Sequence, residues 1–103
     1  MVDQTQIDAW KKQHGEITEV SVKVSDEDTA KCYLKPADDN RTIMARGLSL
    51  SAKGMLLECG EFILDNCWLG GDERFKEEGR VRISGAMQAA QAVEMLEGSQ
   101  KKI

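Results

Sequence analysis

Histidine is almost missing from this sequence, which has a single one, His14, among 103 residues. A serine–histidine–acid triad would therefore have one candidate base, and no serine has an evident histidine partner. We expect His14 at the end of a short helix, as an exposed or capping side chain. Acid–base catalysis needs a carboxylate held out of water, whereas the carboxylate pairs lie in polar connectors: Asp38-Asp39, Asp72-Glu73 and Glu77-Glu78. The sequence predicts no catalytic residue.

Cysteine is sparse as well, and the three residues form no C-x-x-C pair. An odd number without such a pair argues against a disulfide framework. Zinc sites normally use four cysteine or histidine ligands in close pairs, and Cys59 and Cys67 would lie about two helical turns apart. We expect Cys32, Cys59 and Cys67 to be buried thiols that behave as small hydrophobic side chains. A reactive or paired thiol is the alternative, and no metal or other cofactor is predicted.

Long apolar runs are absent, since uninterrupted stretches reach only three residues, as in Met55-Leu56-Leu57 and Phe62-Ile63-Leu64. A helix that crosses a bilayer needs roughly 20 apolar residues, so no membrane span is predicted. The N-terminal segment MVDQTQIDAW also lacks the basic start and apolar segment of a secretory signal. We therefore expect a cytoplasmic protein that has no membrane partner.

Positive charge is neither in excess nor clustered. The chain has 14 basic and 18 acidic side chains, a formal net charge of −4, and both signs are spread evenly over its two halves. The basic pairs Lys11-Lys12 and Lys101-Lys102 do not lie among aromatic residues. Because nucleic-acid binding needs a clustered basic face that neutralises phosphates, no nucleic-acid partner is expected.

The first half of the chain predicts a short helix and a β-hairpin. Residues 4–13 can form a helix that is capped by Asp3 and ended by Gly15. Residues 17–24 and 29–35 show the alternation of half-buried strands, and Pro36 ends the second. The buried faces of the two strands would hold alternate apolar residues: Val20, Val22 and Val24 on the first, and Ala30, Cys32 and Leu34 on the second, with Tyr33 on its other face.

The second half predicts three helices. Asp38 or Asp39 can cap the first, whose apolar side would hold Ile43, Met44, Gly47 and Leu48. Residues 55–68 give the strongest signal, with a stripe of Leu56, Cys59, Ile63 and Cys67 that indicates a mostly buried helix, which Leu69-Gly70-Gly71-Asp72 would end. Residues 81–97 predict the third helix, whose inner face would hold Ile83, Met87, Ala90, Val93 and Leu96.

This order of elements indicates one α+β domain over residues 1–103, with frayed ends at 1–3 and 99–103. A small antiparallel hairpin or sheet would pack against three helices, with a short N-terminal helix before it. Two strands alone are marginally stable. The sheet would therefore depend on helix packing or on a strand from another chain.

Three segments resemble the small phage and prophage proteins that serve as tail assembly chaperones. They are WKKQHGEI at 10–17, CYLKP at 32–36 and NCWLGGD at 66–72, in the same order and at similar separations. NCWLGGD is the most specific of the three, and the resemblance covers roughly residues 8–72. Residues 41–54 depart from it, because the family's longer alanine-rich helix is absent there.

The resemblance implies binding rather than catalysis. A tail assembly chaperone binds the long tape-measure protein and keeps it soluble in the bacterial host cytoplasm until the tail tube forms around it. Helical clients bind by laying an apolar face into a groove, and a homo-oligomer could form through the exposed hairpin edge. The alternative is a small cytosolic protein-interaction or regulatory domain of mobile-element origin with a different partner.

The candidate partner-binding residues are apolar side chains near the glycine pair and on the last helix: Trp68, Leu69, Phe75 and Met87. Tryptophan is enriched among residues that dominate binding energy, and methionine suits adaptable binding surfaces. For Trp68 and for the methionines, a place in the core is the default interpretation, and partner binding is the alternative.

Overall fold

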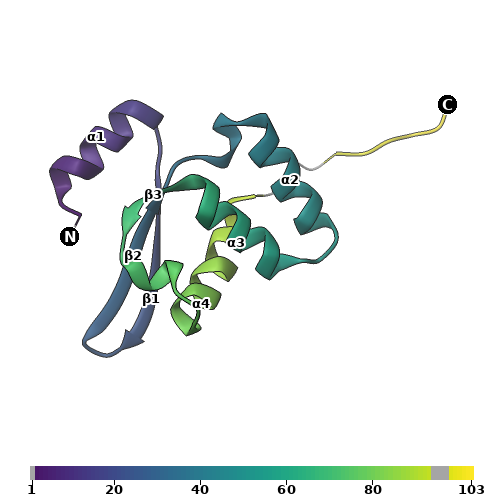
Figure 1. Ribbon diagram of the computed structural model, residues 1–103. Helices are drawn as coiled ribbons and strands as arrows, with labels where there is room; N and C mark the ends of the chain where they lie inside the picture. Colours follow the sequence, from purple (N-terminus) through teal and green to yellow (C-terminus); the bar gives the residue numbers. More distant parts are fainter. Residues whose placement is uncertain (1, 94–97) are drawn as a thin grey trace.

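The elements follow the order that the sequence predicts, with one strand added (Figure 1). The computed structural model describes residues 2–93 and 98–103. The elements are α1 (Gln4–His14), β1 (Thr18–Ser25), β2 (Asp28–Leu34), α2 (Arg41–Ala52), α3 (Leu56–Cys67), β3 (Trp68–Gly71) and α4 (Arg80–Ala89). Short 3-10 segments lie at Ala37–Asp39 (η1), Glu73–Lys76 (η2) and Ala90–Ala92 (η3). The predicted α+β class is confirmed.

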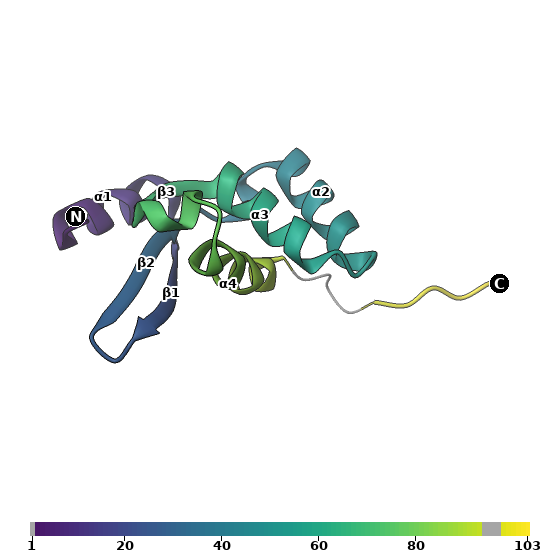
Figure 2. The ribbon, with the colours of Figure 1, turned by 60° about the horizontal axis from the view of Figure 1, so that its bottom comes forward.

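The sheet has three antiparallel strands in the order β1-β2-β3. β1 and β2 form the expected hairpin, in which Val20 faces Cys32 and Ser25 faces Asp28 at the turn. The register of β1 shifts between Lys23 and Ser25. Val24, predicted on the buried face, is 46% exposed at this irregular end of the strand. Figure 2 shows the turn end of the hairpin projecting away from the helices, so the hairpin packs against them mainly at its other end.

β3 lies where the sequence predicts only the end of a helix. Its chain joins β2 closely: the Lys35 N–H donates to the Cys67 carbonyl and the Asp72 N–H donates to the Lys31 carbonyl, both at 2.9 Å. Gly71 has a φ of +143°, and a Cβ there would lie 2.5 Å from the Cα of Cys32. Glycine is therefore required because the two backbones approach closely. Interpreting the glycines only as a helix stop misses this strand.

The core fills the space between one face of the sheet and helices α2, α3 and α4 (Figure 1). α3 is central, because it packs on both α2 and α4. The predicted buried stripe of α3 is confirmed at Cys59, Ile63 and Cys67. Leu56 is instead 43% exposed, since it begins α3 at the end that lies away from β3.

The start of α2 differs from the prediction. Asn40 caps the helix, because its side-chain oxygen accepts the N–H groups of Thr42 and Ile43. Asp38 and Asp39 belong to the 3-10 segment that follows Pro36 and do not cap α2. Asparagine is as good an N-cap as aspartate, so the residue nearest the helix takes the role.

The outer face of the sheet is covered at one end by α1 (Figure 1). The helix has the predicted Asp3 cap, which accepts the Gln6 N–H, and it ends at Gly15 with a φ of +84°. Trp10 packs on Tyr33, with ring centroids 5.8 Å apart. Tyr33 is therefore buried although it points away from the main core.

The inner face predicted for residues 81–97 is confirmed at Ala90 and Val93, which are buried, and is wrong at Ile83 and Met87. Ile83 and Met87 are 51% and 42% exposed, whereas Gly85, Ala86 and Ala89 are buried. The helix is also shorter than the predicted 81–97, because it ends at Ala89 and passes through η3 to an extended Val93. Leu96 and the rest of residues 94–97 lie outside the described residues. Small side chains let α4 approach α3 closely. The side of the helix that carries them therefore faces inward, although the larger apolar side chains lie elsewhere.

The described part of the chain contains no helix that is both long enough and apolar enough to cross a membrane. At the C-terminal end, residues 98–103 are exposed and form no regular secondary structure. At the N-terminal end, Asp3 caps α1 and Val2 is half-buried.

Candidate partner-binding surface

Trp68 and Phe75, which flank the glycine pair in the sequence, lie side by side in the structure. Their ring centroids are 6.4 Å apart, and the Nζ of Lys76 lies 4.6 Å from the centroid of the Trp68 ring. Trp68 is half-buried and packs against the core. One part of the indole thus packs against the core, and the ring remains partly exposed with the Lys76 ammonium group over it.

Phe75 is fully buried, at 0% exposure. Its ring lies over Gly85 of α4, where an added Cβ would come within 2.5 Å of two ring atoms. A partner could not reach this side chain without opening the fold. We therefore correct its interpretation from a partner contact to a core residue, because η2 inserts it between the sheet and α4.

Leu69 is half-buried in β3, and Met87 lies on the exposed side of α4. Met87 follows Gly85 by two residues, which rotates its side chain by about 200° from the Phe75 contact. The four predicted partner residues therefore do not form one surface. Trp68 and Phe75 come together, and Met87 points away from them.

Ile83 is the neighbour of Met87 on the exposed side of α4, because residues four apart lie on one helix face. The apolar spacing of residues 81–97 predicts both on the inner face. A signal was available in the small residues at 85, 86, 89 and 90, whose spacing indicates a close-packed helix face. If that face is the inner one, Ile83 and Met87 must lie outside it, whereas Val81 at the start of α4 packs against the core. We call Ile83 and Met87 the α4 strip.

Ion pairs hold α4 against α3. The Nε of Arg82 donates to Glu61 at 2.8 Å, and its Nη2 donates to Asp65 at 3.1 Å. The Arg82 side chain is 13% exposed, and these hydrogen bonds raise its pKa, Asp65 contributing most. One turn along, the Ala86 backbone lies over Gly60. Together these contacts fix the direction in which the α4 strip faces.

Arg74 joins the hairpin to η2. It donates to both carboxylate oxygens of Asp28, at 2.8 and 3.0 Å, and to Asp72, at 2.8 Å for the shortest contact. The side-chain hydrogen bonds from Arg74 lower the pKa of Asp28 and the pKa of Asp72 below their ordinary values. This paired geometry is characteristic of the strong arginine–carboxylate contacts.

We predict that Arg74→Gln lowers stability at neutral pH and changes the acid dependence. A carboxylate whose folded-state pKa is lowered stabilises the fold above its unfolded pKa, and this contribution is lost as the pH falls through the folded-state pKa. The difference between the two proteins should shrink as the pH falls below about 4. Urea unfolding followed by circular dichroism from pH 7 to pH 2 measures it. Arg41→Gln, which removes the same charge from an exposed site on α2, is the control. A constant difference over this pH range would contradict the prediction.

The three thiols are buried, as predicted. Burial raises the pKa of Cys32 to about 12 and also raises the pKa of Cys59 and of Cys67. The Sγ of Cys59 lies 3.4 Å from the Gly47 carbonyl. Since the thiolate is the reactive form, this environment suppresses thiol chemistry. The described residues contain no group of three or more His, Cys, Asp or Glu side chains placed to hold a metal ion.

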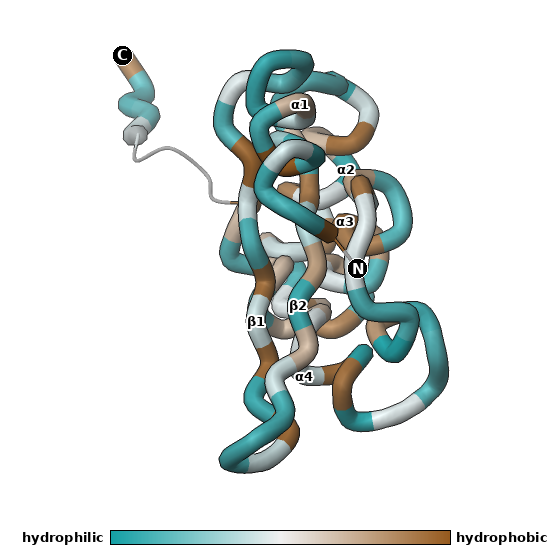
Figure 3. Tube along the Cα trace, turned by 90° about the vertical axis from the view of Figure 1, so that its left-hand side faces the viewer, coloured by the Kyte–Doolittle hydropathy of each residue, from teal (hydrophilic) through white to brown (hydrophobic). Residues whose placement is uncertain are grey.

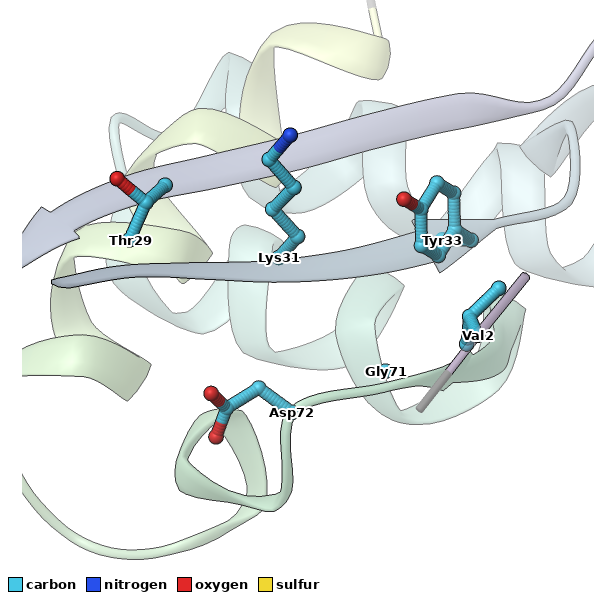
Figure 4. A pocket seen from close by; sticks show the side chains of 6 residues that line it. All are labelled: Val2, Thr29, Lys31, Tyr33, Gly71 and Asp72. Carbon is cyan, nitrogen blue, oxygen red and sulfur yellow. The ribbon is translucent and has the colours of Figure 1, made fainter. Parts of the chain in front are cut away.

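A cavity of about 320 Å³ opens on the outer face of the sheet beside the start of α1 (Figure 4). Its charged side chains are engaged elsewhere, because Lys31 lies 3.7 Å from Glu19 and Asp72 accepts from Arg74. The lining residues are Val2, Thr29, Lys31, Tyr33, Gly71 and Asp72. No set of polar groups converges in it as a ligand site requires.

His14 lies in the last turn of α1, as expected, with its Nδ1 3.8 Å from Asp39 of η1. The contact joins α1 to the segment before α2, and the histidine side chain is only 18% exposed rather than exposed as predicted.

Comparison of the chain with protein-family models, with curated proteins and with solved structures gave no match in any of the three.

Proposed function

We propose that this chain is a protein-binding module of the phage tail assembly chaperone type, which binds the tape-measure protein and keeps it soluble. The observation that carries the proposal is the α4 strip, in which Ile83 and Met87 are 51% and 42% exposed one helical turn apart. Complete burial of such a side chain contributes about 1.5–3 kcal/mol, and about half of this is available at each residue because each is already about half-buried. A client that covers both gains this energy without rearranging the core.

The strip suits an amphipathic helix as its partner. Two large apolar side chains at i and i+4 match the spacing by which one helix contacts another. Methionine adapts to varied client side chains, which a chaperone needs along a long client. The net charge of −4 favours client segments that are neutral or basic on their flanks.

The three segments that resemble tail assembly chaperones meet in this fold, which supports treating them as one pattern. Trp10 of the first segment packs on Tyr33 of the second. Gly70 of the third leaves room for the same indole, since a Cβ there would lie 2.9 Å from the Trp10 ring. Their joint occurrence thus has a packing reason, and the surface left for a client lies elsewhere, on α4.

The test is co-expression with a tape-measure protein encoded by a neighbouring gene. We expect the client to be soluble only when this chain is present. Ile83→Asp/Met87→Asp should abolish that effect while circular dichroism shows an unchanged fold, because both side chains lie outside the core. Val24→Asp, at a valine that is 46% exposed on the hairpin, is the matched control and should solubilise the client normally.

A client that stays insoluble beside the folded wild-type chain would contradict the proposal. That result would favour the alternative, a small protein-interaction or regulatory domain of mobile-element origin. Equal activity of the α4 and Val24 variants would show that the client binds another surface.

A further inference from the structure

The outer edge of β1 has no neighbouring strand among the described residues. β1 is the terminal strand of the sheet and pairs with β2 on one side. Figure 3 shows β1 at the outer side of the sheet, with α4 behind it, where the helix packs against β1. The outward N–H and C=O groups of β1 can therefore pair with another strand.

The central part of β1 is a regular template for such pairing. From Glu19 to Lys23 its register with β2 is continuous, and the segment contains neither proline nor glycine. The irregularity that follows Lys23 is confined to the turn end. The edge is thus unprotected over five residues, the length of a typical strand.

We propose that the segment Glu19–Lys23 of a second copy of this chain pairs antiparallel with it, about a two-fold axis at Ser21. In this register Ser21 faces the partner's Ser21, and Val20 faces the partner's Val22. Glu19 faces the partner's Lys23, and Lys23 faces the partner's Glu19. The two sheets then become one continuous sheet of six strands with the same surface used on both copies, as a two-fold interface requires.

Charge selects this register. Glu19, Ser21 and Lys23 alternate with the valines and share the outer face of the strand, where Glu19 is 45% and Lys23 is 70% exposed. An axis at Ser21 forms two opposite-charge cross-strand pairs, which stabilise a sheet. An axis at Glu19 or at Lys23 would place like charges opposite each other, which destabilises it.

The existing contacts of these charges leave them free to form the new pairs. Glu19 lies 3.7 Å from Lys31, and Lys23 lies 3.4 Å from Asp26. Both ion pairs are exposed, and such pairs contribute little to stability. The dimer would therefore gain its cross-strand pairs without breaking a strong interaction within the chain.

Helix α4 offers a compatible flank. Two shallow grooves of about 100 and 280 Å³ run between β1 and α4. On the helical side, the first groove is lined by Arg80, Val81 and Ser84 of α4, and the second by Gln88 of α4 with Gln91 and Ala92 of η3. The uncharged polar members of this side are Ser84, Gln88 and Gln91. A two-fold axis perpendicular to the sheet brings the partner's α4 to the same face, so these short polar and amide side chains of the two copies can hydrogen-bond to each other. The α4 strip is not used, and each dimer keeps two such strips.

Cysteine cross-linking tests the register directly. Paired Cα atoms in an antiparallel sheet lie about 4.5–5.5 Å apart, within the range of a disulfide. Ser21→Cys should therefore give a disulfide-linked dimer as the main species under mild oxidation. Cys32, Cys59 and Cys67 are all buried and should not interfere. Glu27→Cys, at the exposed hairpin turn, is the control and should stay monomeric.

Charge exchange tests the same contact without a covalent bond. We expect Glu19→Lys and Lys23→Glu each to weaken dimerisation about tenfold or more, measured by analytical ultracentrifugation over a range of concentrations. A mixture of the two variants restores both opposite-charge pairs and should form a heterodimer as strong as the wild-type dimer. A wild-type chain that stays monomeric at millimolar concentration would overturn the proposal. So would a Ser21→Cys yield no greater than that of Glu27→Cys, or charge variants that dimerise as the wild type does.

These outcomes are independent of the client experiment. If the chain dimerises but does not solubilise a tape-measure protein, the proposed dimer stands and the proposed function fails. If the chain is monomeric but solubilises one, the proposed function stands and the proposed dimer fails.

Discussion

Gly60→Ala should destabilise the protein by about 3 kcal/mol or more. A Cβ at position 60 would lie 1.7 Å from the carbonyl oxygen of Ala86 and 2.8 Å from its Cα. These atoms belong to the backbone of α4, so no side-chain rotation can relieve the clash. The two helices would have to separate, and Arg82 would be pulled away from Glu61 and Asp65. Urea unfolding monitored by circular dichroism measures the loss.

Gly47→Ala is the matched control, because it also adds a methyl group to a buried helical glycine. There the nearest atoms are side-chain methyl groups, of Val93 at 3.1 Å and of Ile63 at 3.4 Å, and these can shift slightly. The gain in helix propensity is about 1 kcal/mol, so we expect a net change within about 1 kcal/mol. If Gly60→Ala instead raised stability as a free helix position would, the close contact of α3 with α4 would be wrong.

The local patterns predict most of the elements because each depends on nearby residues. Alternating valines determine β1, and Asp3 and Gly15 determine the ends of α1. The stripe of α3 is predicted at Cys59 and Ile63. In each case, the structure favoured by neighbouring side chains and caps is the same as the structure adopted in the complete fold.

The misses have a common cause, since they depend on contacts between distant segments. β3 exists because Gly70 and Gly71 let the chain pass close to Trp10 and Cys32, and neither contact is visible in a local window. The α4 face was misassigned because large apolar residues were expected inside. Gly85 and Ala86 lie there instead, where only small side chains fit between Phe75 and Gly60.

The candidate site was predicted less well than the fold. Met87 is exposed, as a partner-binding residue must be, and Trp68 is half-buried, which leaves it between core and surface. The burial of Phe75 could not be predicted, because Asp72–Lys76 reads as a charged connector with one aromatic residue. Only the three-dimensional packing of η2 on α4 brings that ring inside.

Phe75→Ala should lower the free energy of unfolding by about 3–5 kcal/mol. The phenyl ring is the largest fully buried side chain of the described chain, and its loss leaves a cavity between η2, Trp68 and α4. Thermal and urea unfolding should show the loss without any partner present. Trp68→Ala should cost less, because half-buried Trp68 has less contact area to lose. A Phe75→Ala variant with wild-type stability would return Phe75 to the partner-contact interpretation.

A double-mutant cycle with Gly85 separates ring packing from a general loss of core. Gly85→Ala alone should destabilise, since its Cβ would come within 2.5 Å of the Phe75 ring. Once Phe75 is alanine, the space that the ring occupied is empty and the same methyl group can enter it. The cost of Gly85→Ala should therefore vanish or change sign in the Phe75→Ala background, a coupling typical of residues in direct contact. Additive losses would mean that the ring does not lie on α4.

The position of the α4 strip depends on this contact, because seating the helix on Phe75 through Gly85 turns Ile83 and Met87 toward solvent.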